Sequence, residues 1–257
     1  GENLTGIDCN DNADSCGWNY DINSTGDGKT SAIYAAFEYQ LTDQITVDVG
    51  VRNEDHEIEY TVDEGLDGVI TKAVQYDESD TAWTAGINYQ FERDQGVFFR
   101  ASEGSKMPFF DDFRDNFGAY SNGEDLIKDV TQFELGYKLA RSNFNVYATG
   151  FFTEIEGDTF VRQPGAPVET LTNEAYGIEL DAAYFNDSGF SVALNATIQE
   201  TEITESANNE GNEAMRQPGW QLRITPNYEF ELGGLEANVY GTLVAVDDRF
   251  SDNENIE

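Results

Sequence analysis

Aromatic rings and one cation are concentrated in a polar stretch at residues 109–120. Aromatic faces and a guanidinium group can together hold an organic ligand by stacking, cation–π contact and hydrogen bonding. The same rings could instead pack the stretch against its neighbours, which buries apolar area without any ligand. The candidate ligand-binding residues are Phe109, Phe110, Phe113, Arg114 and Tyr120, together with Arg162 and Arg216 on two other polar stretches.

Enzyme chemistry finds no support in the residue pattern. His56 is the one histidine of the sequence, and no motif places it beside a serine and an acid, as a hydrolase triad requires. The 50 Asp and Glu residues are so frequent that a pair of them says nothing about acid–base catalysis. We therefore expect a protein that is not an enzyme and that carries no cofactor.

The stretch DINSTGDG, residues 21–28, begins like a calcium-binding loop. Asp21, Asn23 and Thr25 occupy its first, third and fifth positions. The twelfth position requires a bidentate glutamate, and here it is Ala32. We expect a structural turn at this place, with a cation site as the alternative, and we predict no metal centre.

Two cysteines, Cys9 and Cys16, lie in the polar stretch DCNDNADSCGW. A short loop with an even number of cysteines, bounded by Asp, Asn and Gly, suits a local disulfide. Such a bond would place the chain in an oxidising compartment, such as a periplasm or the cell exterior. The acids around the cysteines are expected to belong to a turn, with a cation site as the alternative.

The chain is strongly acidic. Its 257 residues carry 14 Lys and Arg against 50 Asp and Glu, a formal charge of −36. Nucleic acid is therefore excluded as a partner, because phosphate binding needs clustered cations. The acidity fits a solvated surface that is adapted to salty water or kept soluble by repulsion, and cation binding by some of the acids is the alternative. No apolar run reaches the ~18 residues of a transmembrane helix.

Apolar and polar residues alternate along much of the chain, which is the pattern of β-strands with two different faces. In residues 220–232, for example, Trp220 and Leu222 belong to the apolar set and Gln221 and Arg223 to the polar set. The pattern recurs along the chain and predicts ten strands.

Short and long connections alternate between these strands. Tight turns are predicted at residues 41–43, 93–95, 141–143, 186–189 and 233–234. Long connections rich in Gly, Asp and Asn are predicted at residues 54–80, 103–129, 155–173 and 201–218. The repeat is strand, long loop, strand and tight turn, so all tight turns lie at one end of a meander of long hairpins.

The two faces of the predicted sheet indicate a membrane. The polar face carries cations such as Arg52, Arg100 and Lys138, which are expected to offset nearby carboxylates. A closed barrel is the β-structure that presents strands to lipid without unpaired backbone groups. We therefore predict an all-β, antiparallel, up-and-down transmembrane β-barrel whose apolar face meets lipid and whose polar face lines a lumen. Pro226 lacks a ladder donor, and we expect a bulge there.

Aromatic residues near the tight turns support this orientation, because outer-membrane barrels carry aromatic girdles at the membrane interfaces. The expected girdle consists of Tyr39, Tyr89, Phe91, Tyr137, Tyr184, Phe185, Tyr228 and Phe230.

Several segments resemble, in the same order, the late barrel strands of TonB-dependent outer-membrane receptors. FFRASEGSKMPFFDDF (98–113) is similar to a strand that ends in a Ser-Glu-Gly-like triplet and runs into an aromatic, proline-containing loop. DVTQFELGYKLARSNFNVYATGFFTEIEG (129–157) resembles the next hairpin of that family. The strands that follow are similar to NEAYGIELDAAYF (173–185), RQPGWQLRITPNYEF (216–230) and YGTLVAVDDRFSDNEN (240–255). The order and spacing of these segments carry the resemblance.

The resemblance implies a 22-strand barrel, of which residues 1–257 would supply about ten strands as a partial barrel domain. The plug domain that fills the lumen, and the final strands, would be absent from this fragment. The implied function is active import of a scarce nutrient complex, such as a ferric siderophore, haem, cobalamin or an oligosaccharide. The implied location is the outer membrane of a Gram-negative bacterium. The partners would be outer-membrane lipid, lipopolysaccharide and, through the plug domain, the TonB complex that supplies energy.

Three other classes of protein are weighed against a receptor. A passive porin would have shorter strands and one inward-folded loop, and the segment at 98–113 argues against it. An outer-membrane barrel enzyme would need a histidine and a serine on the outer lipid face, which the single His56 hardly provides. A soluble β-sandwich binding protein would also show alternation, but with shorter strands and loops of similar size at both ends.

Overall fold

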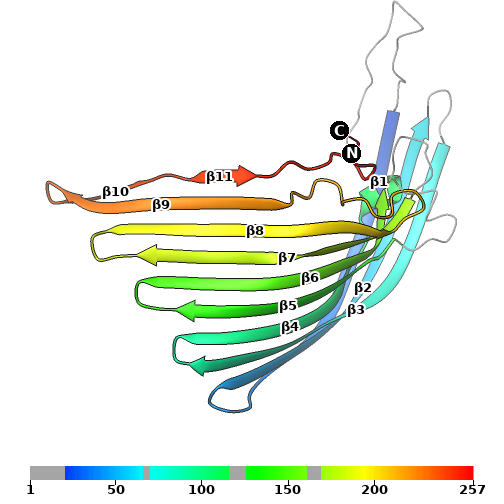
Figure 1. Cartoon of the computed structure of the whole chain (residues 1–257). Helices are drawn as coiled ribbons and strands as arrows, with labels where there is room; N and C mark the ends of the chain where they lie inside the picture. The colour runs from blue at the N-terminus through cyan, green and yellow to red at the C-terminus, as the bar shows by residue number, and fades with distance from the viewer. Residues whose placement is uncertain (1–20, 66–69, 116–125, 161–168, 257) are drawn as a thin grey trace, which may run out of the picture.

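In the computed structural model, described over residues 21–65, 70–115, 126–160 and 169–256, the chain forms one curved antiparallel sheet (Figure 1). From β1 to β10 each strand pairs with the next one along the chain, β11 pairs with β9, and a short helix lies between the fourth and fifth strands. The elements are β1 (Asp21–Gln40), β2 (Ile45–Gly65), β3 (Ile70–Glu92), β4 (Gln95–Lys106), α1 (Phe110–Asp115), β5 (Lys128–Ala140), β6 (Phe144–Phe160), β7 (Glu169–Phe185), β8 (Phe190–Glu205), β9 (Trp220–Leu232), β10 (Leu235–Tyr240) and β11 (Leu243–Val246).

The predicted meander of long hairpins is confirmed, with the five tight turns at one end of the sheet (Figure 1). In the β9–β10 turn, Gly233 and Gly234 have φ angles of 63° and 81°, a left-handed backbone that glycine adopts without steric cost. In the β7–β8 turn, the Asn186 side chain accepts hydrogen bonds from the backbone N–H groups of Ser188 and Phe190 at 3.0 and 3.2 Å. Local turn chemistry therefore sets this end of the sheet.

The strand that follows β9 is interrupted, so that it forms two short strands, and it contains no bulge. β10 and β11 both pair with β9 in one unbroken register. Opposite Pro226, the Gly241 N–H donates to the Pro226 carbonyl oxygen at 3.1 Å. Pro226 has no N–H to return the second bond of this pair, so the ladder loses one bond and the neighbouring strand breaks without slipping. The bulge predicted at Pro226 is therefore wrong.

Three stretches that were predicted as a turn or a loop prove to be largely strand. Residues 21–28 form the start of β1 and pair with β2, so the turn expected there is wrong, and the loop that the alternative cation site would need is a strand. Most of the loop predicted at 54–80 belongs to β2 and β3, and the loop predicted at 155–173 is shortened by β6 and β7. The connections predicted at 103–129 and 201–218 are confirmed in outline. Pairing with a neighbouring strand outweighs the weak strand propensity of Gly-, Asp- and Glu-rich stretches.

The predicted apolar face is confirmed as a continuous exposed surface of the sheet. Ile33, Leu135 and Ile198 are 75%, 63% and 68% exposed, although they stand on well-paired strands. Monomeric soluble proteins seldom expose apolar patches larger than a few hundred Å². Contact with lipid is the environment that suits this face.

Aromatic rings border the apolar face at its turn end. The rings of Tyr89 and Phe91 lie 5.9 Å apart, and those of Tyr228 and Phe230 stack at 5.8 Å. Phe185 was also expected in this girdle. It alternates in step with the polar residues of β7 and lies opposite a serine of β8, so it lies on the other face. The girdle is otherwise at the level that the sequence predicted.

A second group of outward-facing aromatics lies towards the long connections. On β3 it begins with Trp83, whose indole N–H donates to Glu103 Oε2 at 3.0 Å. From Trp83 to Phe91 the strand covers about 26 Å at roughly 3.3 Å per residue, which a tilt of about 40° reduces to about 20 Å. The two aromatic levels therefore enclose an apolar band close to the height of an outer-membrane barrel's band. Among the described residues, no helix is long and apolar enough to cross a membrane.

The long connections should face the cell exterior and the tight turns the periplasm, as in outer-membrane barrels. A cysteine at Asn208, between β8 and β9, should react with a membrane-impermeant maleimide on intact cells. A cysteine at Ser188, in the β7–β8 turn, should react only after the outer membrane is permeabilised. Both positions are exposed, and serine at Cys9, Cys16 and every other cysteine of the whole protein removes the background. The opposite labelling pattern would refute this orientation.

Candidate ligand-contact surface

An ion pair on the polar face bridges two strands across a third. Asp48 on β2 and Arg100 on β4 both lie opposite Gly86 on β3, and Arg100 Nη2 is 3.2 Å from Asp48 Oδ1. A Cβ atom at Gly86 would lie only 2.5 Å from Asp48 Oδ2. The glycine therefore leaves the space through which the carboxylate reaches Arg100, which explains a glycine inside a strand.

A second glycine on this face accommodates an aromatic ring. Phe98 on β4 lies opposite Gly136 on β5, and Phe98 Cε1 would be 1.9 Å from a Cβ atom at that glycine. Lys138 Nζ lies 4.5 Å from the centre of the Phe98 ring, which allows a cation–π contact. Two cations of this face, Arg100 and Arg52, thus offset carboxylates, and Arg52 does so by pairing with Glu54. Lys138 instead covers a ring.

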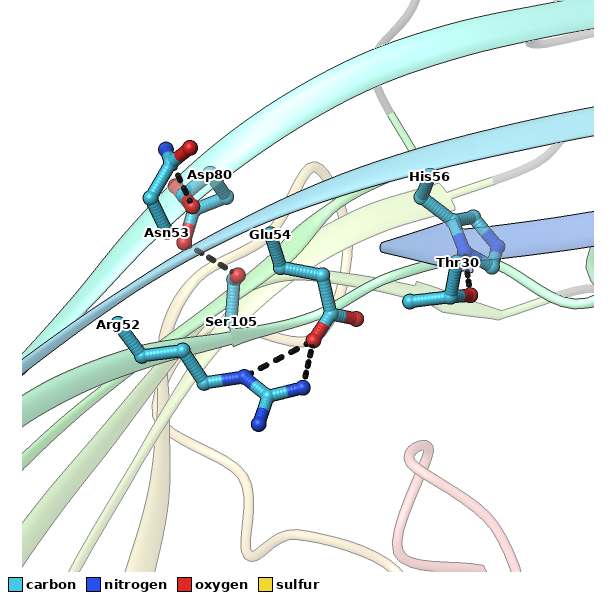
Figure 2. A network of polar contacts seen from close by, with 7 residues as sticks. All are labelled: Thr30, Arg52, Asn53, Glu54, His56, Asp80 and Ser105. Atoms are coloured by element: carbon cyan, nitrogen blue, oxygen red, sulfur yellow. Dashed lines mark hydrogen bonds and ion pairs between the residues drawn. The ribbon is translucent and has the colours of Figure 1, made fainter. Parts of the chain in front are cut away.

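Side chains connect three strands where the regular ladder between β3 and β4 ends (Figure 2). Ser105 Oγ on β4 donates to Asp80 Oδ2 on β3 at 2.5 Å. Asn53 Nδ2 on β2 donates to the backbone carbonyl oxygen of the same Asp80 at 3.1 Å. Asp80 therefore joins β2, β3 and β4 at the level where the chain leaves β4 towards α1.

The connection that contains α1 folds against the polar face of β2 and β3. Phe113 is 0% exposed, and its ring meets Tyr76 edge-on with centroids 5.2 Å apart. Phe110 stacks on Tyr60 with centroids 5.8 Å apart. Hydrophobic burial anchors this connection to the wall. The other members of the buried cluster are Ile58, Val62, Val74 and Leu126.

His56 is a second anchor of the same connection. Its side chain is 7% exposed, and its Nε2 lies 3.1 Å from the carbonyl oxygen of Pro108. A carbonyl oxygen can only accept, so Nε2 donates this bond. The other ring nitrogen, Nδ1, lies 2.8 Å from Thr30 Oγ1 on β1 (Figure 2). Sequence reasoning missed this role, because the partner is 52 residues away in the chain.

The predicted ligand-binding aromatics separate into packed and exposed residues. Phe113 is buried against β3, as in the packing alternative, whereas Phe110 stacks on Tyr60 of β2 and stays 36% exposed. Phe109 is 61% exposed, and Lys106 Nζ lies 5.9 Å from its ring centre. Arg216 is exposed in the connection between β8 and β9, with a φ of 62°. Among these residues, Phe109 presents the largest free aromatic face to a ligand.

Several predicted site residues cannot be placed. Tyr120, Arg162, Cys9 and Cys16 lie outside the described residues, and Arg114 belongs to α1 but its side chain lies outside the description. Their predicted roles in ligand binding and in a disulfide stay predictions.

Charged groups also decorate the strands beyond the membrane band. Lys29 Nζ on β1 donates to Glu57 Oε1 on β2 at 2.9 Å, and this hydrogen bond raises the pKa of Lys29 above its ordinary value. In the part of the chain that the structure describes, no three His, Cys, Asp or Glu side chains are grouped so that they could hold a metal ion. The polar face offers the rings and charged groups described above, such as Phe98, Lys138 and the Asp48–Arg100 pair, as its means of contacting a ligand.

The sequence matches one protein-family model over almost its whole length. The model is described as TonB dependent receptor-like, beta-barrel, and the match covers residues 3–256. No match was found among the curated proteins.

Solved structures with a similar fold include three that are named as an uptake receptor, an import receptor and a transporter of ferric complexes. The ferric yersiniabactin uptake receptor FyuA from Yersinia pestis has a TM-score of 0.76 and 17% identity, covering 92% of this chain and 37% of that chain. The ferric citrate transporter FecA in its unliganded form has a TM-score of 0.70 and 16% identity, covering 95% and 36%. The ferric-catecholate import receptor Fiu from K12 E. coli has a TM-score of 0.67 and 18% identity, covering 80% and 32%. The chain thus spans about a third of these structures, and at such identities the likeness establishes the fold.

Proposed function

This chain belongs to the TonB-dependent receptor β-barrel family, and on that premise we propose that it forms part of the wall of a receptor that imports a scarce nutrient complex with energy from the TonB system. The observation that carries the proposal is the family match over residues 3–256. Receptors of this family reside in the outer membrane of Gram-negative bacteria. The exposed apolar band between two levels of aromatic rings suits that membrane.

The nutrient class is inferred from the similar structures and from two side chains at the long-connection end of the sheet. Three similar structures are named for ferric yersiniabactin, ferric catecholate and ferric citrate, so a ferric complex is the first candidate, ahead of haem, cobalamin or an oligosaccharide. Phe109 and Lys106 at the long-connection end of the inner wall offer a ring and a cation to such a complex. The remainder of the barrel, a plug domain and its contact with TonB would complete the receptor.

Energy dependence separates this function from that of a passive channel. Uptake would be compared in a strain that lacks the gene for the whole protein and in the same strain with the gene restored. The probes would be ⁵⁵Fe as its citrate, catecholate and hydroxamate complexes, and labelled cobalamin. We expect accumulation of one of these probes to rise at least about tenfold on restoring the gene. Removing TonB should abolish that gain.

Two outcomes would contradict the proposal. A gain that persists without TonB would indicate a passive porin. Equal permeability to all probes, with no saturation as their concentration rises, would indicate the same, because a receptor has a binding step that saturates.

A further inference from the structure

A cavity of about 720 Å³ lies at the long-connection end of the sheet. One wall is the end of β8 together with the connection between β8 and β9, and the other wall is the segment that follows β11. Small-molecule sites in proteins usually measure about 300–1,000 Å³. The cavity is thus large enough for part of an organic ligand.

Hydrogen bonds fix the two walls relative to each other. The Asn255 side chain accepts from the Glu213 N–H at 2.7 Å and donates to the Glu213 carbonyl oxygen at 2.9 Å. Asn253, which is 4% exposed, accepts from the Met215 N–H at 3.1 Å. The Arg216 N–H donates to the Phe250 carbonyl oxygen at 2.8 Å. The cavity is therefore preorganised, and a ligand need not order these segments in order to bind.

The lining of the cavity has a marked charge imbalance. Four acidic residues and one arginine belong to the lining, and the two acids of the second wall are adjacent residues, Asp247 and Asp248. The carboxylate of Glu200, on the first wall, also accepts a hydrogen bond from the Tyr176 hydroxyl. Concave walls lined by one sign of charge concentrate the field and attract ions of the opposite sign. The other charged lining residues are Glu200, Glu213 and Arg249.

Apolar groups lie in the same lining. Phe250 and Pro218 belong to opposite walls, and Ile256 adds an aliphatic side chain. A bare metal ion would gain nothing from these groups, whereas an alkyl or aromatic stem next to a charged head would contact them.

We propose that this cavity binds an organic cation, a primary ammonium or guanidinium group on an apolar stem, carried by the nutrient complex that the receptor imports. The inference rests on the proposed function for the role of the ligand, but not for the binding itself. A receptor that selects an anionic complex would not be expected to carry such a cavity, because an anion would meet four carboxylates there.

Charged thiol reagents would measure the field in the cavity. Ser251 lines the cavity and is exposed. The variant S251C would be made in the full-length receptor, with serine at Cys9, Cys16 and any other cysteine. Its modification would be measured with two methanethiosulfonates of similar size, one carrying a trimethylammonium group and one a sulfonate. N208C is the control, because Asn208 is exposed on the same side without lining the cavity. At each position the rate with the cationic reagent is divided by the rate with the anionic reagent, and this ratio is corrected for the reactivity of the two reagents with a free thiol. We expect the corrected ratio to be about tenfold higher at S251C than at N208C.

Removing the cavity charges should remove that preference. The pair D247N/D248N on one wall and E213Q on the other should each lower the ratio at S251C towards that at N208C, with the larger change for the pair. Heat-modifiable migration of each variant in gels would verify the folded barrel. Equal ratios at S251C and N208C in the unaltered receptor would overturn the inference.

Ligand protection would test binding itself. Phenethylammonium should slow the reaction of S251C with a neutral methanethiosulfonate, with saturation, and phenylpropionate of matched size should not. D247N/D248N should abolish the protection. Equal protection by both probes, protection by neither, or saturable protection by Ca²⁺ alone would overturn the inference. This assay uses purified receptor, so its failure leaves TonB-dependent uptake untouched, and failed uptake leaves this binding result standing.

Discussion

Residues 1–257 produced alone in water are expected to form insoluble aggregates. The apolar face carries side chains such as Leu135 and Ile178, which are 63% and 60% exposed on paired strands. A surface of that kind exceeds the apolar patch that a soluble monomer tolerates. The charge of −36 opposes association but cannot cover this face, because the alternation directs charged side chains mainly to the other face and to the connections.

Open sheet edges act in the same direction. In the described sheet, β1 pairs only with β2, and β10 and β11 pair only with β9, so backbone groups along both edges are available for strand addition. Fractionation after expression, followed by refolding with and without detergent, would measure the effect. We expect nearly all of the protein in the pellet, and dispersed β-rich protein only with detergent or lipid. A monodisperse monomer that unfolds cooperatively without detergent would sink the membrane assignment and favour a soluble β-sandwich.

Phe113→Ala should release the α1 connection from the wall, and Phe109→Ala should not. Phe113 is 0% exposed in the cluster with Tyr76 and Leu126, and loss of a buried Phe side chain costs about 3–5 kcal/mol. At roughly 1.4 kcal/mol per tenfold change, opening of the connection should become at least about a hundredfold more frequent. Hydrogen exchange at residues 107–113, in the full-length receptor, would report it.

Phe109→Ala is the matched control. Phe109 is 61% exposed, and substitutions on a surface usually change stability by less than about 0.5 kcal/mol. Exchange at residues 107–113 should therefore stay at the parental rate, while affinity for the imported complex should fall if Phe109 contacts it. Equal loss of protection in the two variants would show that Phe113 is not the anchor. Unchanged affinity in Phe109→Ala would remove Phe109 from the candidate ligand contacts.

Only part of the candidate site could be predicted from the sequence. The concentration of rings at residues 109–120 identified a connection whose described residues Phe110 and Phe113 contact the polar face of β2 and β3. Which ring packs and which is exposed depends on partners such as Tyr60 and Tyr76, which are far from α1 in the sequence. The asparagines that join the walls of the cavity carried no sequence signal, because Asn253 and Asn255 read as ordinary polar residues of a loop.

The length of the first three strands shows another limit. The sequence pattern placed the end of β2 near Arg52, because beyond it charged residues follow one another and the outward positions turn polar. The structure continues β2 to Gly65, with Ile58, Tyr60 and Val62 on the polar face, buried in the cluster with Phe113. Outside the membrane both faces of a strand can be wet or covered by a loop, so the alternation that marks a lipid-facing strand is lost although the backbone ladder continues.

The sequence by itself determined the strand meander, its tight turns, the two faces of the sheet and the family. The meander, its turns and its faces follow from local rules: a period of two residues, turn residues, and the apolar surface that lipid requires. The family follows from the order and spacing of the segments between residues 98 and 255. Only the tertiary structure decided the contacts across strands, such as Asp48 with Arg100 over Gly86 and His56 with Pro108. Such contacts depend on register and on the folding of a connection over the wall, and both bring together residues whose separation in the chain carries no periodic signal.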